Sequence, residues 1–159
     1  MNEKRILIVD DEAAILSVLK GSLKKLGDEY VVATAPDGQS ALAQLKRSPF
    51  DPVITDYRMA GMDGLELLEE VRALQPNART ILMTAYGNDK VEEEARRLQA
   101  YRYLIKPLEI DNFRWIVKSA LNDVAISRPG ILILSDERYK EIAWSLVRIQ
   151  PGPLKIKCF

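Results

Sequence analysis

Short apolar runs alternate along this chain with longer stretches of helical periodicity, and this alternation limits the fold more than any other feature. The predicted strands are 6–9, 30–35, 52–55, 80–84 and 101–105. The predicted helices are 14–26, 40–46, 63–74, 88–99 and 109–124. Strand–helix–strand units of this length form right-handed crossovers between parallel strands. We therefore predict an α/β fold, a doubly wound (βα)₅ parallel sheet with helices on both faces.

Glycine, aspartate and proline mark several of the expected boundaries. Gly27 is expected as the C′ residue of the first helix. Asp37 and Gly38 are expected to open the second helix, and Asp63 the third. Pro52 cannot donate a ladder hydrogen bond, so we place it at the first position of its strand.

Composition excludes several classes of protein. The 23 basic residues balance the 23 acidic ones, so net charge gives no reason to expect nucleic-acid or membrane binding. The chain has no histidine, which excludes a Ser-His-Asp triad and histidine zinc ligands. No apolar run reaches the roughly 20 residues of a membrane span. The single cysteine, Cys158, fits a reducing compartment, and we expect a cytoplasmic protein without a signal peptide.

Residues 128–159 form a separate part of the prediction. They contain a possible short strand at 131–134 and a helix at 136–149, which is too little for an independent domain. The expected organisation is one domain over 1–127 and a C-terminal extension over 128–159. The extension could dock on its own domain, pair two copies, or be the remnant of an output module.

Charged and hydroxyl side chains follow the predicted strands at their carboxyl ends. Asp10 and Asp11 follow the first strand, Asp56 the third, Thr84 ends the fourth and Lys106 follows the fifth. Ligands of open parallel sheets bind at this edge. Clustered carboxylates repel one another unless a cation neutralises them, and Mg²⁺ prefers carboxylate oxygens. The pattern therefore predicts a magnesium site.

The same residues suggest chemistry at phosphorus. A carboxylate beside a bound cation and an amine can act as a nucleophile and form an aspartyl phosphate. Asp56, alone on a central strand, is the better nucleophile, whereas Asp10 and Asp11 suit metal binding. Lys106 would neutralise charge on the phosphoryl oxygens, and Thr84 could donate a hydrogen bond to one of them.

Four segments together closely resemble the receiver domains of bacterial two-component response regulators, over about residues 3–125. They are Asp10-Asp11, the run 56–64, Leu82–Ala85 and Lys106-Pro107. The resemblance implies a flavodoxin-like fold with strand order 2-1-3-4-5. The corresponding Lys-Pro peptide bond is often cis in this family, so the resemblance implies that Lys106-Pro107 can be cis.

The resemblance implies a role for each site residue. Asp56 would be the phosphoacceptor, Lys106 the phosphate-binding lysine, and Asp10, Asp11, Asp56 and the Arg58 carbonyl the Mg²⁺ ligands. The position of Ala60, where the family commonly has proline, suggests a less rigid loop after Asp56.

The resemblance further implies a switch. Thr84 and Tyr103 would change position on phosphorylation, and Arg58 and Tyr86 would tune dephosphorylation. A histidine kinase would be the phosphoryl donor. The fourth helix, fifth strand and fifth helix would contact an unknown downstream protein or form a homodimer, with no direct nucleic-acid or membrane binding. Such a protein is not an enzyme beyond its own phosphorylation and dephosphorylation.

Other functions stay open at this point. A Mg²⁺-dependent phosphatase or phosphotransferase with an aspartyl-phosphate intermediate would want a second acid two residues after Asp56, where Arg58 stands. A flavin or nucleotide carrier would want a glycine-rich loop after the first strand, which has Asp10-Asp11-Glu12 instead. A scaffold that is never phosphorylated would not need the full acid set.

Overall fold

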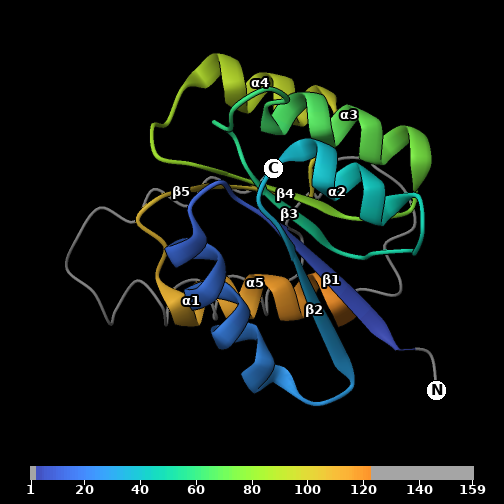
Figure 1. Ribbon diagram of the computed structural model, residues 1–159. Helices are drawn as coiled ribbons and strands as arrows, with labels where there is room; N and C mark the ends of the chain where they lie inside the picture. The colour runs from blue at the N-terminus through green and yellow to red at the C-terminus, as the bar shows by residue number, and fades with distance from the viewer. Residues whose placement is uncertain (1–2, 123–159) are drawn as a thin grey trace, which may run out of the picture.

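The computed structural model describes residues 3–122 and contains one parallel sheet within them. Its strands are β1 (Lys4–Val9), β2 (Tyr30–Ala35), β3 (Val53–Asp56), β4 (Thr80–Thr84) and β5 (Arg102–Ile105). They lie in the order β2-β1-β3-β4-β5, and every neighbouring pair is parallel (Figure 1). The predicted fold class and strand order are confirmed.

Helices cover the sheet on both faces, as Figure 1 shows, with α2, α3 and α4 above it and α1 and α5 below. Their bounds are α1 (Ala13–Leu23), α2 (Gly38–Leu45), α3 (Gly64–Leu74), α4 (Asp89–Arg97) and α5 (Ile110–Asn122), and a 3₁₀ turn, η1 (Lys24–Leu26), follows α1. The predicted extension over 128–159 lies outside the described residues.

Strand β1 shows why this sequence forms a sheet buried on both sides. Its residues Ile6 and Ile8 point into the apolar layer under α1 and α5, and Leu7 and Val9 point into the layer under α2 and α3. All four side chains are fully buried. A strand covered on both faces reads as a continuous apolar run, which is the pattern of residues 6–9.

Some helices begin or end at other residues than predicted, because apolar spacing does not fix the ends of a helix. Helix α1 ends at Leu23, and η1 separates it from Gly27, which has a φ of 143°. Helix α2 starts at Gly38, before the predicted range 40–46, but Asp37 opens it as expected, because its side chain accepts a hydrogen bond from the Ser40 N–H at 2.7 Å.

The third strand is shifted by one residue from its expected range. Asp56 belongs to β3, whereas Pro52 precedes it and accepts a hydrogen bond from the Leu7 N–H through its carbonyl. The Lys106-Pro107 peptide is cis, as expected, and so is Asp51-Pro52.

Candidate functional site

Three charged side chains meet at the carboxyl edge of the sheet. Lys106 Nζ lies 2.9 Å from Asp10 Oδ2 and 2.8 Å from Asp56 Oδ1. Asp10 is fully buried and Asp56 is 6% exposed. These residues follow β1, end β3 and follow β5, so the parallel sheet brings together positions that are far apart in the sequence.

Burial and charge set the electrostatics of this cluster. Burial raises the pKa of Asp56 above its ordinary value, and the hydrogen bond and charge of Lys106 lower it only in part, while Asp10 raises it further. Burial lowers the pKa of Lys106, but the two carboxylates outweigh that effect and hold it above its ordinary value. Lys106 therefore remains a cation, and the two acids lie in a site that favours added positive charge.

The acid pair after β1 has two different environments. Asp10 Oδ1 accepts the Glu12 N–H at 2.9 Å, whereas Asp11 is exposed. Within residues 3–122, no group of three or more His, Cys, Asp or Glu side chains converges closely enough to hold a metal ion unaided. The donor chemistry still fits a hard cation, because the two buried carboxylates of Asp10 and Asp56 share one ammonium group and Asp11 follows Asp10 in the sequence.

Thr84 and Tyr103, the two expected switch residues, are buried, and each forms a hydrogen bond to the loop between β4 and α4. Thr84 Oγ1, 2% exposed, donates to the Tyr86 carbonyl at 3.1 Å and receives the Tyr86 N–H at 3.3 Å. Tyr103 Oη accepts the N–H of Asn88, the N-cap residue of α4, at 3.4 Å. Burial is the main cause of a raised pKa for Tyr103.

Arg58, in the loop after β3, and Tyr86, in the loop after β4, contact each other. The Arg58 guanidinium lies 5.7 Å from the centroid of the Tyr86 ring, which is within the range of a cation–π interaction. Tyr86 is 70% exposed, so this contact lies at the surface of the site. Spacing in the sequence could not show that these side chains meet.

The two consecutive peptide units that follow the Asp56 Cα each form hydrogen bonds through both their carbonyl oxygen and their N–H group. In the first, the Asp56 carbonyl accepts the Thr55 hydroxyl at 3.0 Å, and the Tyr57 N–H donates to the Met83 carbonyl at 2.7 Å. In the second, the Tyr57 carbonyl accepts the Gly64 N–H at 2.8 Å, and the Arg58 N–H donates to Asp56 Oδ2 at 3.0 Å. We call these two units the Asp56 clamp.

Sequence reasoning missed part of this clamp. Thr55 reads as an ordinary strand residue. Gly64 was expected to start a helix and, by the resemblance, to shape the loop after Asp56, but its contact with the Asp56 backbone was not predicted. Gly64 is required for steric reasons. A Cβ added there would lie 2.3 Å from the Asp56 carbonyl oxygen and 2.9 Å from the Tyr57 Cα. Only glycine lets α3 start this close to the backbone of Asp56.

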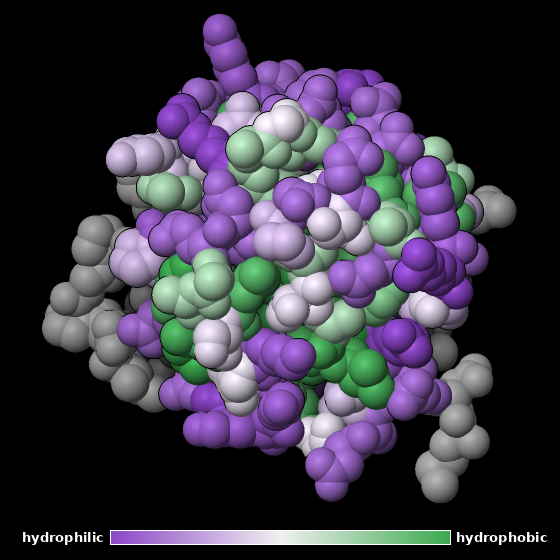
Figure 2. Space-filling model, viewed as in Figure 1, coloured by the Kyte–Doolittle hydropathy of each residue, from purple (hydrophilic) through white to green (hydrophobic). Residues whose placement is uncertain are grey.

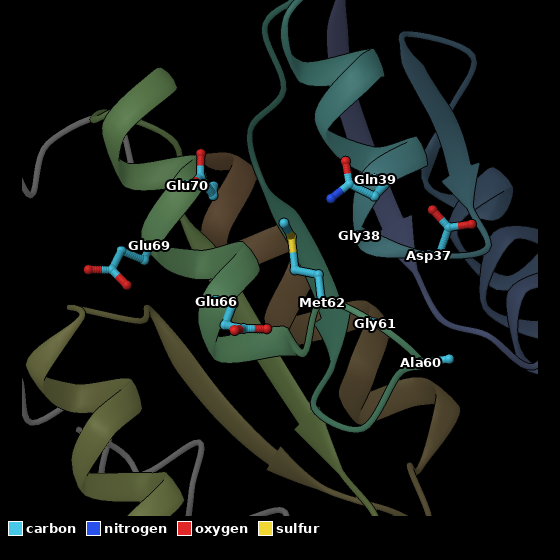
Figure 3. A pocket seen from close by; sticks show the side chains of 9 residues that line it. All are labelled: Asp37, Gly38, Gln39, Ala60, Gly61, Met62, Glu66, Glu69 and Glu70. Carbon is cyan, nitrogen blue, oxygen red and sulfur yellow. The ribbon is translucent and has the colours of Figure 1, made fainter.

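Other surface features lie away from the charged cluster. A cavity of about 750 Å³ opens between α2 and α3, and Figure 3 shows Met62 and Gln39 in the gap between these helices. Its lining includes four acids but none of the charged residues at the sheet edge. Figure 2 shows hydrophobic residues at the surface over α1, where Val18 is 56% exposed.

Comparison with known proteins decides the family. Residues 6–118 match the family model of the response regulator receiver domain. The chain belongs to this family. It is therefore a phosphorylation-activated switch of two-component signalling. Within residues 3–122, no helix is both long and apolar enough to cross a membrane.

Two protein sequences and one solved structure show how similar this receiver domain is to known members of the family. It is 41% identical over 116 residues to the transcriptional regulatory protein ZraR of Escherichia coli K12, covering 73% of this chain but only 26% of ZraR. It is 39% identical over 121 residues to sporulation initiation phosphotransferase F of Bacillus subtilis, covering 76% and 95% of the two chains. The structure of TrrA from Thermotoga maritima in complex with Mg²⁺ and BeF matches with a TM-score of 0.66 and 36% identity, covering 74% and 98%.

Proposed function

We propose that Asp56 of this receiver domain accepts a phosphoryl group from a histidine kinase. The contact that carries the proposal is Lys106 Nζ at 2.8 Å from Asp56 Oδ1, in a site where Asp56 is nearly buried. An Asp56 oxygen attacks phosphorus, the phosphorus–nitrogen bond of the phosphohistidine breaks, and the imidazole leaves with the electron pair and takes up a proton. Lys106 balances negative charge on the phosphoryl oxygens.

Mg²⁺ is the proposed cofactor. Asp10, Asp11, Asp56 and the Arg58 carbonyl would hold it, and the bound ion would supply positive charge beside the reacting oxygens. Support comes from the two buried carboxylates that share one lysine, and from the TrrA structure, which is a complex with Mg²⁺ and BeF. Asp10 also keeps Lys106 positioned between the two acids.

The remaining site residues are proposed to transmit and time the signal. Thr84 would leave its bonds to Tyr86 and donate to the phosphoryl group, and Tyr103 would follow it. The change would be read on α4, β5 and α5 by a downstream protein or a second copy. Arg58 and Tyr86, which already contact each other, would limit the access of water to the phosphorylated Asp56.

Intact mass after incubation with acetyl phosphate and Mg²⁺ tests the acceptor. The wild type is expected to gain one phosphoryl group, and Asp56→Asn none, because an amide is not a nucleophile toward phosphorus. Asp111→Asn, an exposed acid of α5, is the matched control and should behave as the wild type. No gain in the wild type, or a gain in Asp56→Asn, would overturn the proposal.

A second candidate is transfer of the phosphoryl group onward, because a relative at 39% identity is named a phosphotransferase. We propose that this chain catalyses only its own phosphorylation and dephosphorylation. Sustained hydrolysis of a phosphomonoester such as p-nitrophenyl phosphate, lost in Asp56→Asn, would contradict this view and favour an enzyme.

A further inference from the structure

Thr55 is a fully buried polar residue that the proposed function does not use. It lies on β3 directly before Asp56 and is 0% exposed. Its hydroxyl has the sulfur of Met59, a residue of the apolar layer under α2 and α3, as a weak and distant acceptor at 4.0 Å. Valine has nearly the same shape and would suit these apolar surroundings better, because a buried hydroxyl is unfavourable unless it is hydrogen-bonded.

The Thr55 hydroxyl is hydrogen-bonded to the backbone of the proposed phosphoacceptor. It donates to the Asp56 carbonyl oxygen at 3.0 Å. That carbonyl shares its peptide unit with the Tyr57 N–H, which donates to the Met83 carbonyl of β4. The peptide plane after Asp56 is therefore fixed from both sides, by a side chain of its own strand and by the neighbouring strand.

The orientation of this plane determines where the Arg58 N–H, a hydrogen-bond donor to the Asp56 carboxylate, is placed. The next peptide unit donates from the Arg58 N–H to Asp56 Oδ2 at 3.0 Å, while Oδ1 lies 2.8 Å from Lys106 Nζ. Rotation of the first plane would carry the second with it and would move the Arg58 N–H away from the carboxylate. A displacement of about 1 Å at a reacting group can greatly reduce a rate.

We propose that Thr55 is a positioning residue for the phosphorylation of Asp56. Its hydroxyl fixes the Asp56 clamp and so holds the carboxylate between Lys106 and the Arg58 N–H. Thr55 does not touch the phosphoryl donor and acts only through the backbone of Asp56. This inference rests on the proposed function of Asp56.

Substitutions that differ only in the hydroxyl test the inference. Thr55→Val keeps the shape of the side chain, and the pair Thr55→Ser and Thr55→Ala differs by the hydroxyl alone. Thr80→Val makes the same change at another buried threonine of the sheet, at the opposite end of β4 from Thr84. Phosphorylation by acetyl phosphate at saturating Mg²⁺ is followed by intact mass, beside thermal unfolding of each variant.

Loss of the hydroxyl is expected to slow phosphorylation about fivefold to tenfold, the usual effect of one hydrogen bond. Thr55→Val and Thr55→Ala should show this loss, and Thr55→Ser and Thr80→Val should stay within about twofold of the wild type. A wild-type rate in Thr55→Val, or an equal loss in Thr55→Ser and Thr55→Ala, would overturn the inference. If Thr55→Val does not fold, the serine and alanine pair decides.

A second measurement separates this inference from the proposed function. The ¹H–¹⁵N resonance of Arg58, recorded without phosphoryl donor, reports its hydrogen bond to Asp56 Oδ2. It should shift in Thr55→Val and Thr55→Ala but not in Thr80→Val. An unchanged resonance refutes the role of Thr55 even if Asp56 is phosphorylated. A wild type that gains no phosphoryl group refutes the proposed function, and a shifted resonance in Thr55→Val would then still show that Thr55 holds the Arg58 N–H against Asp56.

Discussion

Single residues at the sheet edge have to satisfy two conflicting demands. Asp10 and Asp56 need burial to lie at a defined position, yet two buried carboxylates repel each other. Lys106 contacts both at hydrogen-bonding distance, so one ammonium group relieves the repulsion. Gly64 meets a different demand, because it lets the backbone after Asp56 lie against the first turn of α3.

Gly64→Ala is expected to destabilise the domain and impair phosphorylation. The new Cβ would lie 2.3 Å from the Asp56 carbonyl oxygen, and a backbone atom cannot yield as a flexible side chain can. Overpacking of this kind costs about 1–3 kcal/mol in the free energy of unfolding, which urea denaturation measures.

Gly21→Ala is the control, because a Cβ there has no neighbour within 4 Å in the described part of the chain. A helical alanine should stabilise α1 by up to about 1 kcal/mol. Equal effects of the two substitutions would contradict this reading.

The side chains of the site could be predicted from the sequence, but their backbone supports could not. Asp10, Asp56 and Lys106 are recognisable because a simple rule places the ends of parallel strands at one edge. Thr55 and Gly64 act through backbone atoms, and a hydrogen bond to a carbonyl leaves no pattern of residue types. The prediction also grouped Asp11 with Asp10, whereas only Asp10 is buried.

At the scale of elements, helix starts are the best defined features. The Asp63 side chain accepts the Glu66 N–H at 2.9 Å, and the Glu66 side chain accepts the Asp63 N–H at 2.9 Å, which forms a capping box. This cap sets where α3 begins and so where Gly64 meets the loop after Asp56. Strands β2 and β4 have their predicted bounds, whereas the end of α1 was wrong because its last residues form η1.

Asp63→Ala is expected to lower the free energy of unfolding by about 1 kcal/mol, because it removes the acceptor for the first turn of α3. Asp63→Ser keeps a capping oxygen and should retain most of the stability. Asp111→Ala removes an acid inside the first turn of α5 that pairs with Arg114 and caps no helix, and it serves as the control for loss of an acid without loss of a cap. Urea denaturation measures all three, and a loss in Asp111→Ala as large as in Asp63→Ala would show that capping is not the cause.

The whole domain is two apolar layers joined by one sheet, and the site lies where the strands of that sheet end. Its polar edge is not isolated from the core. β3 carries Ile54 in one apolar layer, Val53 in the other, and Asp56 at its end. Binding at the edge should therefore change the stability of the entire domain.

Mg²⁺ is expected to raise the unfolding temperature of the wild type, because a ligand that binds only the folded state stabilises it. At ten times its Kd the gain is about 1.4 kcal/mol. Asp10→Asn and Asp56→Asn should lose most of this gain, and KCl of equal ionic strength should not reproduce it. Calorimetry with and without EDTA measures the effect, and an equal Mg²⁺ response in wild type and variants would place the ion elsewhere.

The contact between Lys106 and Asp10 joins residues 96 positions apart. A chain growing on the ribosome contains Asp10 and then Asp56 before this lysine is added, so an incomplete chain holds both acids without their shared cation. The proposed phosphorylation site is therefore complete only when β5 has joined the sheet and brought Lys106 to the two acids.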